Sequence, residues 1–195
     1  MIQTTIPVIL ASSSPRRREL LQGLGIPFTV LSSDVDESTS PELTPQEIVE
    51  SLAQRKAREV AKNVSDGLVI GADTIVVLDG NVLGKPRDEA DAFQMLQSLQ
   101  GREHTVYSGV AIVDVKAGRE EVAHRSTKVR IRSLTEHEIK AYITTKEPMD
   151  KAGSYAIQGI GATIVDSIEG DYFTVVGLPL NLMADMLSRF GVQIL

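Results

Sequence analysis

The first apolar run of the chain leads into three serines and a proline, and this junction limits the fold more than any other part of the sequence. Val8–Ala11 is short and apolar, which is typical of a buried strand. Pro15 suits the first turn of a helix, because its fixed φ fits there and its missing N–H is not needed. The sequence therefore predicts a buried strand that leads into a turn and a helix, with Ser14 as the residue that caps the helix.

The predicted helix carries Arg16, Arg17 and Arg18 in its first turn. A helix N-terminus has unpaired N–H donors and partial positive charge, so anions bind there readily and cations are unfavourable. Guanidinium groups also match phosphate oxygens in geometry. The three arginines therefore favour a phosphate-binding turn. The alternative is a solvated helix face that binds nothing.

The composition indicates a soluble globular protein that could bind phosphates only at a local site. The 195 residues can bury one core or two small lobes, and the net charge of −6 argues against a nucleic-acid partner. The absence of cysteine excludes disulfides and thiolate ligands and fits a reducing compartment. The sequence shows neither a signal-like N-terminus nor an apolar run of membrane-spanning length, so we expect a cytoplasmic protein with no membrane partner.

Strands and helices alternate early in the chain and hairpins follow, which predicts an α/β fold with a mixed sheet. Helices are expected at 15–24, from the capping box Thr44–Glu47 to about Asn63, after Asp88 as far as Leu99, after the capping box Thr135–Glu138, and from Pro179 to Phe190. Strands are expected at 8–11, 28–31, 68–78, 82–83, 104–114, 122–132, 162–165 and 172–176. The segment Asp150–Gly161 is glycine-rich, and its apolar residues follow neither the helical nor the strand spacing. No linker divides the chain, so we expect one domain.

Candidate catalytic residues begin with Asp73, which directly follows the apolar run Leu68–Ala72. A carboxylate there could hold a metal or accept a proton, although an aspartate that ends a strand and caps a turn would look the same. Glu37 lies in an acidic loop and Lys85 precedes a proline. Each could equally be a solvated surface residue without a catalytic role. Metal-assisted hydrolysis of a phosphoanhydride needs cationic side chains that bind the phosphates and carboxylates that bind the metal. The sequence offers both.

Several separated blocks of the sequence resemble the Maf family of nucleoside triphosphate pyrophosphatases, also called septum-formation inhibitor proteins. The blocks are Leu10–Arg17, the loop of Glu37, Gly71–Thr74, Gly84–Pro86, Asp150–Gly159 and Val176–Pro179, and they span nearly the whole chain. The resemblance implies one Maf-like domain over residues 1–195, with a mixed, strongly twisted sheet flanked by helices. It also implies two lobes around a central cleft, as in the inosine-triphosphate pyrophosphatases, and allows a homodimer.

Three positions follow the branch of the family that acts on dTTP and UTP, namely Arg16, Thr74 and Gln158. The branch acting on 7-methyl-GTP has tryptophan, glutamine and glutamate there. The resemblance thus implies hydrolysis of dTTP, UTP and modified pyrimidine nucleotides to the monophosphate and pyrophosphate, in a house-cleaning role or one linked to arrest of cell division. The alternative is a non-catalytic, nucleotide-binding regulator of septum formation.

The resemblance also implies roles for individual residues. Asp73 and Glu37 are expected to be catalytic and to hold a divalent cation, Mg²⁺ or Mn²⁺, and the choice of a single general base stays open because two such carboxylates titrate together. Phosphate binding is expected from Ser12, Arg16, Arg17, Lys56 and Lys85. Base specificity is expected from Arg16, Thr74 and Gln158, since an amide offers both a donor and an acceptor to thymine or uracil.

Overall fold

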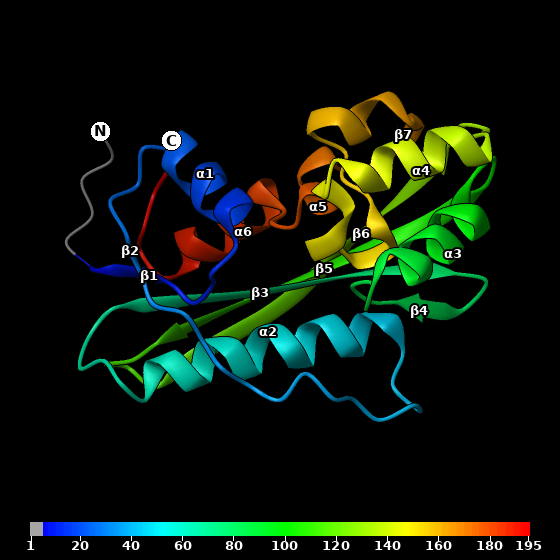
Figure 1. Ribbon diagram of the computed structural model, residues 1–195. Helices are drawn as coiled ribbons and strands as arrows, with labels where there is room; N and C mark the ends of the chain where they lie inside the picture. Colours follow the sequence, from blue (N-terminus) through cyan, green and yellow to red (C-terminus); the bar gives the residue numbers. More distant parts are fainter. Residues whose placement is uncertain (1–5) are drawn as a thin grey trace. The chain divides into compact units, whose positions relative to one another are not determined.

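A computed structural model describes residues 6–195 and shows a mixed α/β fold built on a seven-stranded sheet (Figure 1). The strands are β1 (Val8–Leu10), β2 (Thr29–Val30), β3 (Leu68–Leu78), β4 (Asn81–Leu83), β5 (Glu103–Asp114), β6 (Arg119–Ile131) and β7 (Val165–Glu169). The α-helices are α1 (Pro15–Gly23), α2 (Pro45–Ala61), α3 (Glu89–Leu99), α4 (Glu136–Thr144), α5 (Tyr172–Val176) and α6 (Leu180–Arg189). Three short 3₁₀ helices are η1 (Glu147–Asp150), η2 (Ala152–Ser154) and η3 (Gly159–Thr163).

The sheet has the strand order β2-β1-β3-β5-β6-β7, and β4 pairs with β3. The mixed sheet predicted from the sequence is confirmed, because β1 pairs in parallel with β2 and β3, whereas β4 and β7 pair antiparallel with their neighbours. Among the helices of residues 6–195, none combines the length and the apolar character that a membrane span requires.

The chain forms two compact units, each made of separate stretches of sequence. Among the described residues, unit 1 contains residues 6–73 together with Ser108–Arg125 and Gly177–Leu195. Unit 2 contains Thr74–Tyr107 and Ser126–Val176. The long strands β3, β5 and β6 therefore contribute residues to both units.

Helices cover both faces of the sheet in unit 1 (Figure 1). Successive side chains of a strand point to opposite faces, so Leu10 and Ile70 lie on one face and Ile9 and Val69 on the other. The first pair belongs to the core beneath α1 and α6. The second pair packs with Ala57 and its neighbours on α2. Each face thus has its own apolar cluster, and α2 alone contributes the helical residues of the second cluster.

Two glycines allow α2 to approach the sheet closely. A Cβ added at Gly71 would lie 2.2 Å from the carbonyl oxygen of Ala53, and one at Gly109 would lie 2.3 Å from that of Val49. Real Cβ atoms do not tolerate such contacts, so only glycine permits this spacing. The start of α2 is fixed by the predicted capping box, in which the Thr44 hydroxyl accepts from the N3 main-chain N–H and the N3 carboxylate accepts from the Thr44 N–H.

Unit 2 has a core of its own beneath α3 and α4. Leu96 of α3 and Ile139 of α4 are fully buried against Val129 of β6. Both helices begin where the sequence predicts. The Asp88 side chain accepts from the N–H of Asp91 at the start of α3, and α4 begins with its capping box.

Two sequence predictions near the end of the chain are wrong. Residues 172–176 form helix α5 rather than a strand, because the Asp171 carboxylate accepts from both the N–H and the hydroxyl of Thr174 and so closes a helical turn. The strand predicted at 162–165 begins only at Val165, since Gly159–Thr163 forms η3.

The predicted capping role of Ser14 is also wrong. Ser14 occupies the N-cap position of α1, but its side chain makes no capping hydrogen bond. Instead the N–H of Ser14 donates to the Ser12 hydroxyl at 3.2 Å. The turn after β1 is therefore organised by Ser12.

We expect Gly71→Ala to destabilise the protein by about 1–3 kcal/mol, because the added methyl group overpacks the contact with α2. Gly23→Ala is the matched control, because a Cβ added at Gly23 meets nothing within 4 Å. Gly23 also lies in helix α1, where alanine is favoured over glycine. Urea denaturation followed by circular dichroism measures both variants. Equal unfolding midpoints for Gly71→Ala and the wild type would contradict the close approach.

Candidate active site

Strand β3 places Asp73 on the face of the sheet that α2 covers. The strand runs from Leu68 to Leu78, as predicted, so Asp73 lies within it and the alternative of an aspartate that ends a strand and caps a turn is excluded. Side chains alternate along a strand, and Asp73 therefore follows Val69 and Gly71 toward α2. Only 7% of Asp73 is exposed, which is unusual for a carboxylate without a cationic partner.

Lys56 of α2 is that partner, and it joins two carboxylates. Its Nζ lies 2.7 Å from Asp73 Oδ1 and 2.7 Å from Glu37 Oε1. The side chains of Lys56 and Asp73 are 12% and 10% exposed, whereas that of Glu37 is 56% exposed. An ion pair with so little water around it is stronger than one at the surface. Acidic residues from two distant parts of the sequence therefore meet at one ammonium group.

Burial and the nearby positive charges shift the pKa of Asp73 in opposite directions. Burial raises the pKa of Asp73, and the positive charges of Lys56 and Arg17 act to lower it. The nearby charge of Glu37 acts in the same direction as burial. The two cations thus stabilise the ionised form of a carboxyl group whose burial favours the protonated form.

The guanidinium of Arg17 is held in place by main-chain and side-chain acceptors. Its Nε donates to the carbonyl oxygen of Gly177 at 2.8 Å, and its Nη1 donates to the Ser12 hydroxyl at 3.4 Å. Burial lowers the pKa of Arg17, and the negative charge of Asp73 acts to raise it. An arginine side chain stays protonated at neutral pH. The sequence block that contains Gly177 therefore has a structural role in fixing Arg17.

Arg16 and Arg18 differ from Arg17 in their surroundings. Arg16 is half-buried, and its charge contributes to the lowered pKa of Arg17, so the two guanidinium groups are neighbours. Arg18 is exposed. Neither Arg16 nor Arg18 makes a side-chain hydrogen bond to any of residues 6–195. Of the three arginines, Arg17 is the one that the fold orients, and Arg18 has the surroundings of a solvated residue.

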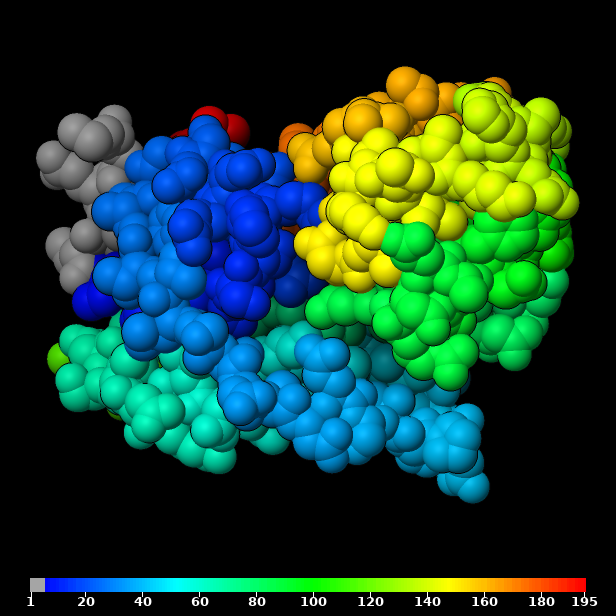
Figure 2. Space-filling model, viewed as in Figure 1, coloured from blue at the N-terminus to red at the C-terminus, as the bar shows by residue number. Residues whose placement is uncertain are grey.

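Arg55, which sequence reasoning missed, fixes the loop that carries Glu37. Its Nη1 donates to the carbonyl oxygens of Asp36 at 2.9 Å and Ser38 at 2.8 Å. The Asp36 carboxylate accepts from the hydroxyl and the N–H of Ser38, and these bonds lower the pKa of Asp36. The loop lies at the surface, where its light-blue atoms are visible in Figure 2. From this loop, the side chain of Glu37 pairs with Lys56. No local sequence signal marks Arg55 as the residue that holds the loop.

Thr74, Lys85 and Gln158 belong to unit 2. Lys85 is exposed, and its loop contacts the glycine-rich segment through a bond from the N–H of Gly153 to the carbonyl oxygen of Gly84 at 3.1 Å. Thr74 and Gln158 are half-buried. The amide of Gln158 makes no hydrogen bond within residues 6–195. The roles expected of these three residues stay predictions.

Within residues 6–195, none of the three histidines belongs to a group of three or more side chains that could hold a metal. His104 is nevertheless buried, and its Nε2 lies 2.7 Å from the hydroxyl of Tyr155. Burial lowers the pKa of His104 to about 4, so this imidazole is neutral at neutral pH. His104 is therefore part of the core of unit 2.

The carboxylates of Glu37 and Asp73 offer oxygen ligands that suit a hard divalent cation. Mg²⁺ commonly binds one or two carboxylates and completes its shell with water and substrate phosphates. Among residues 6–195, no group of three or more histidine, cysteine, aspartate or glutamate side chains is arranged to hold a metal. The donor set therefore fits a cation that binds together with a phosphate ligand rather than a closed metal centre.

A family model described as Maf-like protein matches residues 7–190. The chain belongs to the Maf family. Its relatives include the dTTP/UTP pyrophosphatase of Pelotomaculum thermopropionicum, 54% identical over 188 residues that cover 96% of this chain and 98% of the relative. The dTTP/UTP pyrophosphatase of Moorella thermoacetica is 55% identical over 187 residues, with 96% of each chain covered.

The fold of this Maf protein is also similar to that of the Staphylococcus aureus Ham1 protein. The two align with a TM-score of 0.56 at 15% identity, covering 94% of this chain and 98% of the other. At this identity the likeness concerns the fold alone. The α/β fold with a mixed sheet and the family predicted from the sequence are confirmed.

We expect Lys56→Met to reduce the free energy of unfolding by up to about 3–5 kcal/mol, because it leaves the buried Asp73 carboxylate without its ion pair. Adding Asp73→Asn should recover much of this loss, since the second substitution removes the uncompensated charge. Lys62→Met is the control, because Lys62 pairs with Glu59 at the exposed end of α2. Urea denaturation of the single and double variants gives the coupling. Strictly additive effects would show that the ion pair contributes nothing.

Proposed function

We propose that this protein hydrolyses nucleoside triphosphates between the α- and β-phosphates, releasing the monophosphate and pyrophosphate, with dTTP and UTP as preferred substrates. The observation that carries the proposal is the buried Asp73 carboxylate, held by Lys56 and near Arg17, with Glu37 on the same ammonium group. The names of relatives that are 54% and 55% identical support the choice of substrates.

Phosphate binding begins with Arg17 and Ser12. Because Gly177 already fixes the Arg17 guanidinium, little reorganisation is needed when negative charge develops on the leaving pyrophosphate. Arg16, adjacent in the same helical turn, adds a second guanidinium that has no side-chain hydrogen bond within residues 6–195. Lys56 and Lys85 complete the set of proposed phosphate ligands.

Asp73 is the proposed general base. It takes a proton from water as the water oxygen attacks the α-phosphorus, and the bond from that phosphorus to the bridging oxygen breaks, so that pyrophosphate leaves with the electron pair. Burial makes Asp73 a stronger base than an ordinary aspartate, since its pKa is raised. The positive charges of Lys56 and Arg17 act to lower the pKa of Asp73 and so favour the ionised form that accepts the proton. The proton then passes to solvent.

A divalent cation, Mg²⁺ or Mn²⁺, would be held by Glu37 and Asp73 and would neutralise phosphate charge when bound. Arg55 supports this arrangement by fixing the loop of Glu37. Base recognition is assigned to Arg16, Thr74 and Gln158, with the free amide of Gln158 facing the polar edge of thymine or uracil. A homodimer, a cytoplasmic location and the cellular role stay predictions.

Asp73→Asn should lower kcat by roughly 10²–10⁴-fold, because the amide cannot accept the proton of water. Pyrophosphate release from a panel of nucleotides, with and without Mg²⁺, measures the effect. Asp185→Asn, which changes an exposed aspartate paired with Arg189, should match the wild type. A near-normal kcat for Asp73→Asn would remove Asp73 as the base. A wild type that binds nucleotides but releases no pyrophosphate would favour a non-catalytic regulator.

Arg17→Ala should weaken the binding of an α,β-methylene analogue of dTTP by about 1.5–3 kcal/mol, the usual value of a charge-assisted hydrogen bond. Isothermal titration calorimetry measures the change without turnover. Arg18→Ala is the matched control, because the neighbouring arginine is exposed, and we expect its affinity to equal that of the wild type. If the two variants bind the analogue equally well, Arg17 does not contact phosphate.

A further inference from the structure

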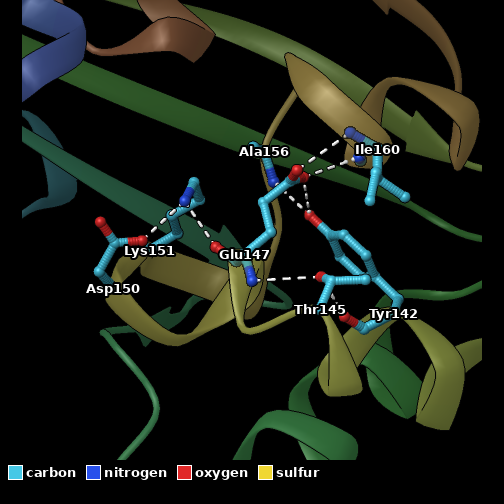
Figure 3. A network of polar contacts seen from close by, with 8 residues as sticks. Tyr142, Thr145, Glu147, Asp150, Lys151, Ala156 and Ile160 are labelled. Atoms are coloured by element: carbon cyan, nitrogen blue, oxygen red, sulfur yellow. Dashed lines mark hydrogen bonds and ion pairs between the residues drawn. The ribbon is translucent and has the colours of Figure 1, made fainter.

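A carboxylate that takes no part in the steps above holds one side of the glycine-rich segment (Figure 3). Glu147 Oε2 accepts a hydrogen bond from the N–H of Ile160 at 3.0 Å, and its Oε1 accepts one from the N–H of Gly161 at 2.8 Å. The hydroxyl of Tyr142 donates to the same Oε1 at 2.8 Å. Glu147 thus fixes the main chain just after Gln158.

The hydroxyl of Tyr142 holds the other side of the same segment. It accepts from the N–H of Ala156 at 3.1 Å while it donates to Glu147 (Figure 3). Tyr142 itself is 4% exposed and lies in the core of unit 2. The two side chains therefore fix the main chain on both sides of residues 157–159. Gln158 is at the centre of this short span, with an amide that makes no hydrogen bond within residues 6–195.

Two glycines of the segment leave the space that these hydrogen bonds require. A Cβ at Gly159 would lie 2.5 Å from Glu147 Oε2, and Gly159 has a left-handed φ of +65°. A Cβ at Gly161 would lie 2.5 Å from the Tyr142 hydroxyl and 2.2 Å from the carbonyl oxygen of Ala156. The main chain can contact the carboxylate and the phenol this closely only because glycine occupies both positions.

Further contacts fix the position of Glu147. Its N–H donates to the Thr145 hydroxyl at 3.2 Å, and its carbonyl oxygen accepts from Lys151 Nζ at 2.5 Å (Figure 3). Burial acts to raise the pKa of Glu147, but the hydrogen bonds from Gly161, Tyr142 and Ile160 outweigh it and hold the pKa below the ordinary value. Glu147 is therefore ionised at neutral pH and acts only as an acceptor.

We propose that Glu147 and Tyr142 are positioning residues for base selectivity, which they support by holding the main chain on both sides of Gln158. This inference rests on the proposed function, in which the Gln158 amide contacts the pyrimidine. Neither side chain needs to touch the nucleotide. A base-reading amide discriminates only if its main chain is held in place, because a shift of the segment would let the amide follow a mismatched base.

Glu147→Gln and Tyr142→Phe test the inference. The first replaces a carboxylate oxygen with an NH₂ group that cannot accept from the main chain, and the second removes the bridging hydroxyl. We expect each to lower kcat/KM for dTTP and UTP by roughly 10-fold, mainly through a higher KM, because a hydrogen bond that orders the site is lost. The kcat/KM values for ATP and GTP should change much less. The selectivity ratio therefore falls in both variants.

The effect of Glu147→Gln is also measured in a protein that carries Gln158→Ala, which tests whether Glu147 acts through Gln158. If Glu147 acts through Gln158, then adding Glu147→Gln to Gln158→Ala should not lower the selectivity ratio further. An equal fall in both backgrounds, or an unchanged ratio in Glu147→Gln and Tyr142→Phe, would overturn the inference. Glu136→Gln is the matched control, since Glu136 pairs with Lys140 at the surface of α4 and should keep the wild-type ratio.

The same measurements separate this inference from the proposed function. A wild type that hydrolyses dTTP and UTP no faster than ATP and GTP would contradict the proposed substrate preference itself. A selective wild type with equally selective variants would contradict only the positioning role. Thermal unfolding of every variant identifies a folding defect, and if Glu147→Gln does not fold, Tyr142→Phe carries the test.

Discussion

The contact between the main chain of α2 and the sheet determines where the charged groups of unit 1 lie. Gly71 and Gly109 allow this contact, and no other residue type fits at either position. At this spacing Lys56 reaches Asp73 from the helix, while Arg55, one residue earlier, bonds the acidic loop. The close main-chain packing at these two glycines thus sets the geometry of an ion pair and of a loop. The chemistry proposed for the site therefore depends on a packing constraint at Gly71, two residues before Asp73.

The charges of the site are balanced before a ligand binds. When all four groups are ionised, the two negative charges of Glu37 and Asp73 equal the two positive charges of Lys56 and Arg17. A triphosphate carries more negative charge than these cations can neutralise alone. In the proposed function, a divalent cation bound with the substrate would restore the balance.

Local signals were sufficient for much of the fold and for part of the site. The run Val8–Ala11 and the capping box at Thr44 depend on neighbours in sequence, and both were predicted correctly. Residues 172–176 were predicted as a strand, whereas hydrogen bonds from Thr174 to the preceding aspartate make them helical. Arg55 and Glu147 could not be found, because their partners are main-chain groups that only the folded chain brings to them.

The acceptor for Arg17 comes from a late part of the chain. Gly177 supplies this carbonyl oxygen, and Leu178 and Met183, which follow it, join the core that contains Leu10 of the first strand. During synthesis the serine–arginine turn leaves the ribosome early, yet the Nε of Arg17 lacks its carbonyl acceptor until Gly177 has emerged as well. A nascent chain that stops before Gly177 therefore lacks part of the proposed phosphate site, and a nucleotide that bound there could stabilise only a chain that has passed Gly177.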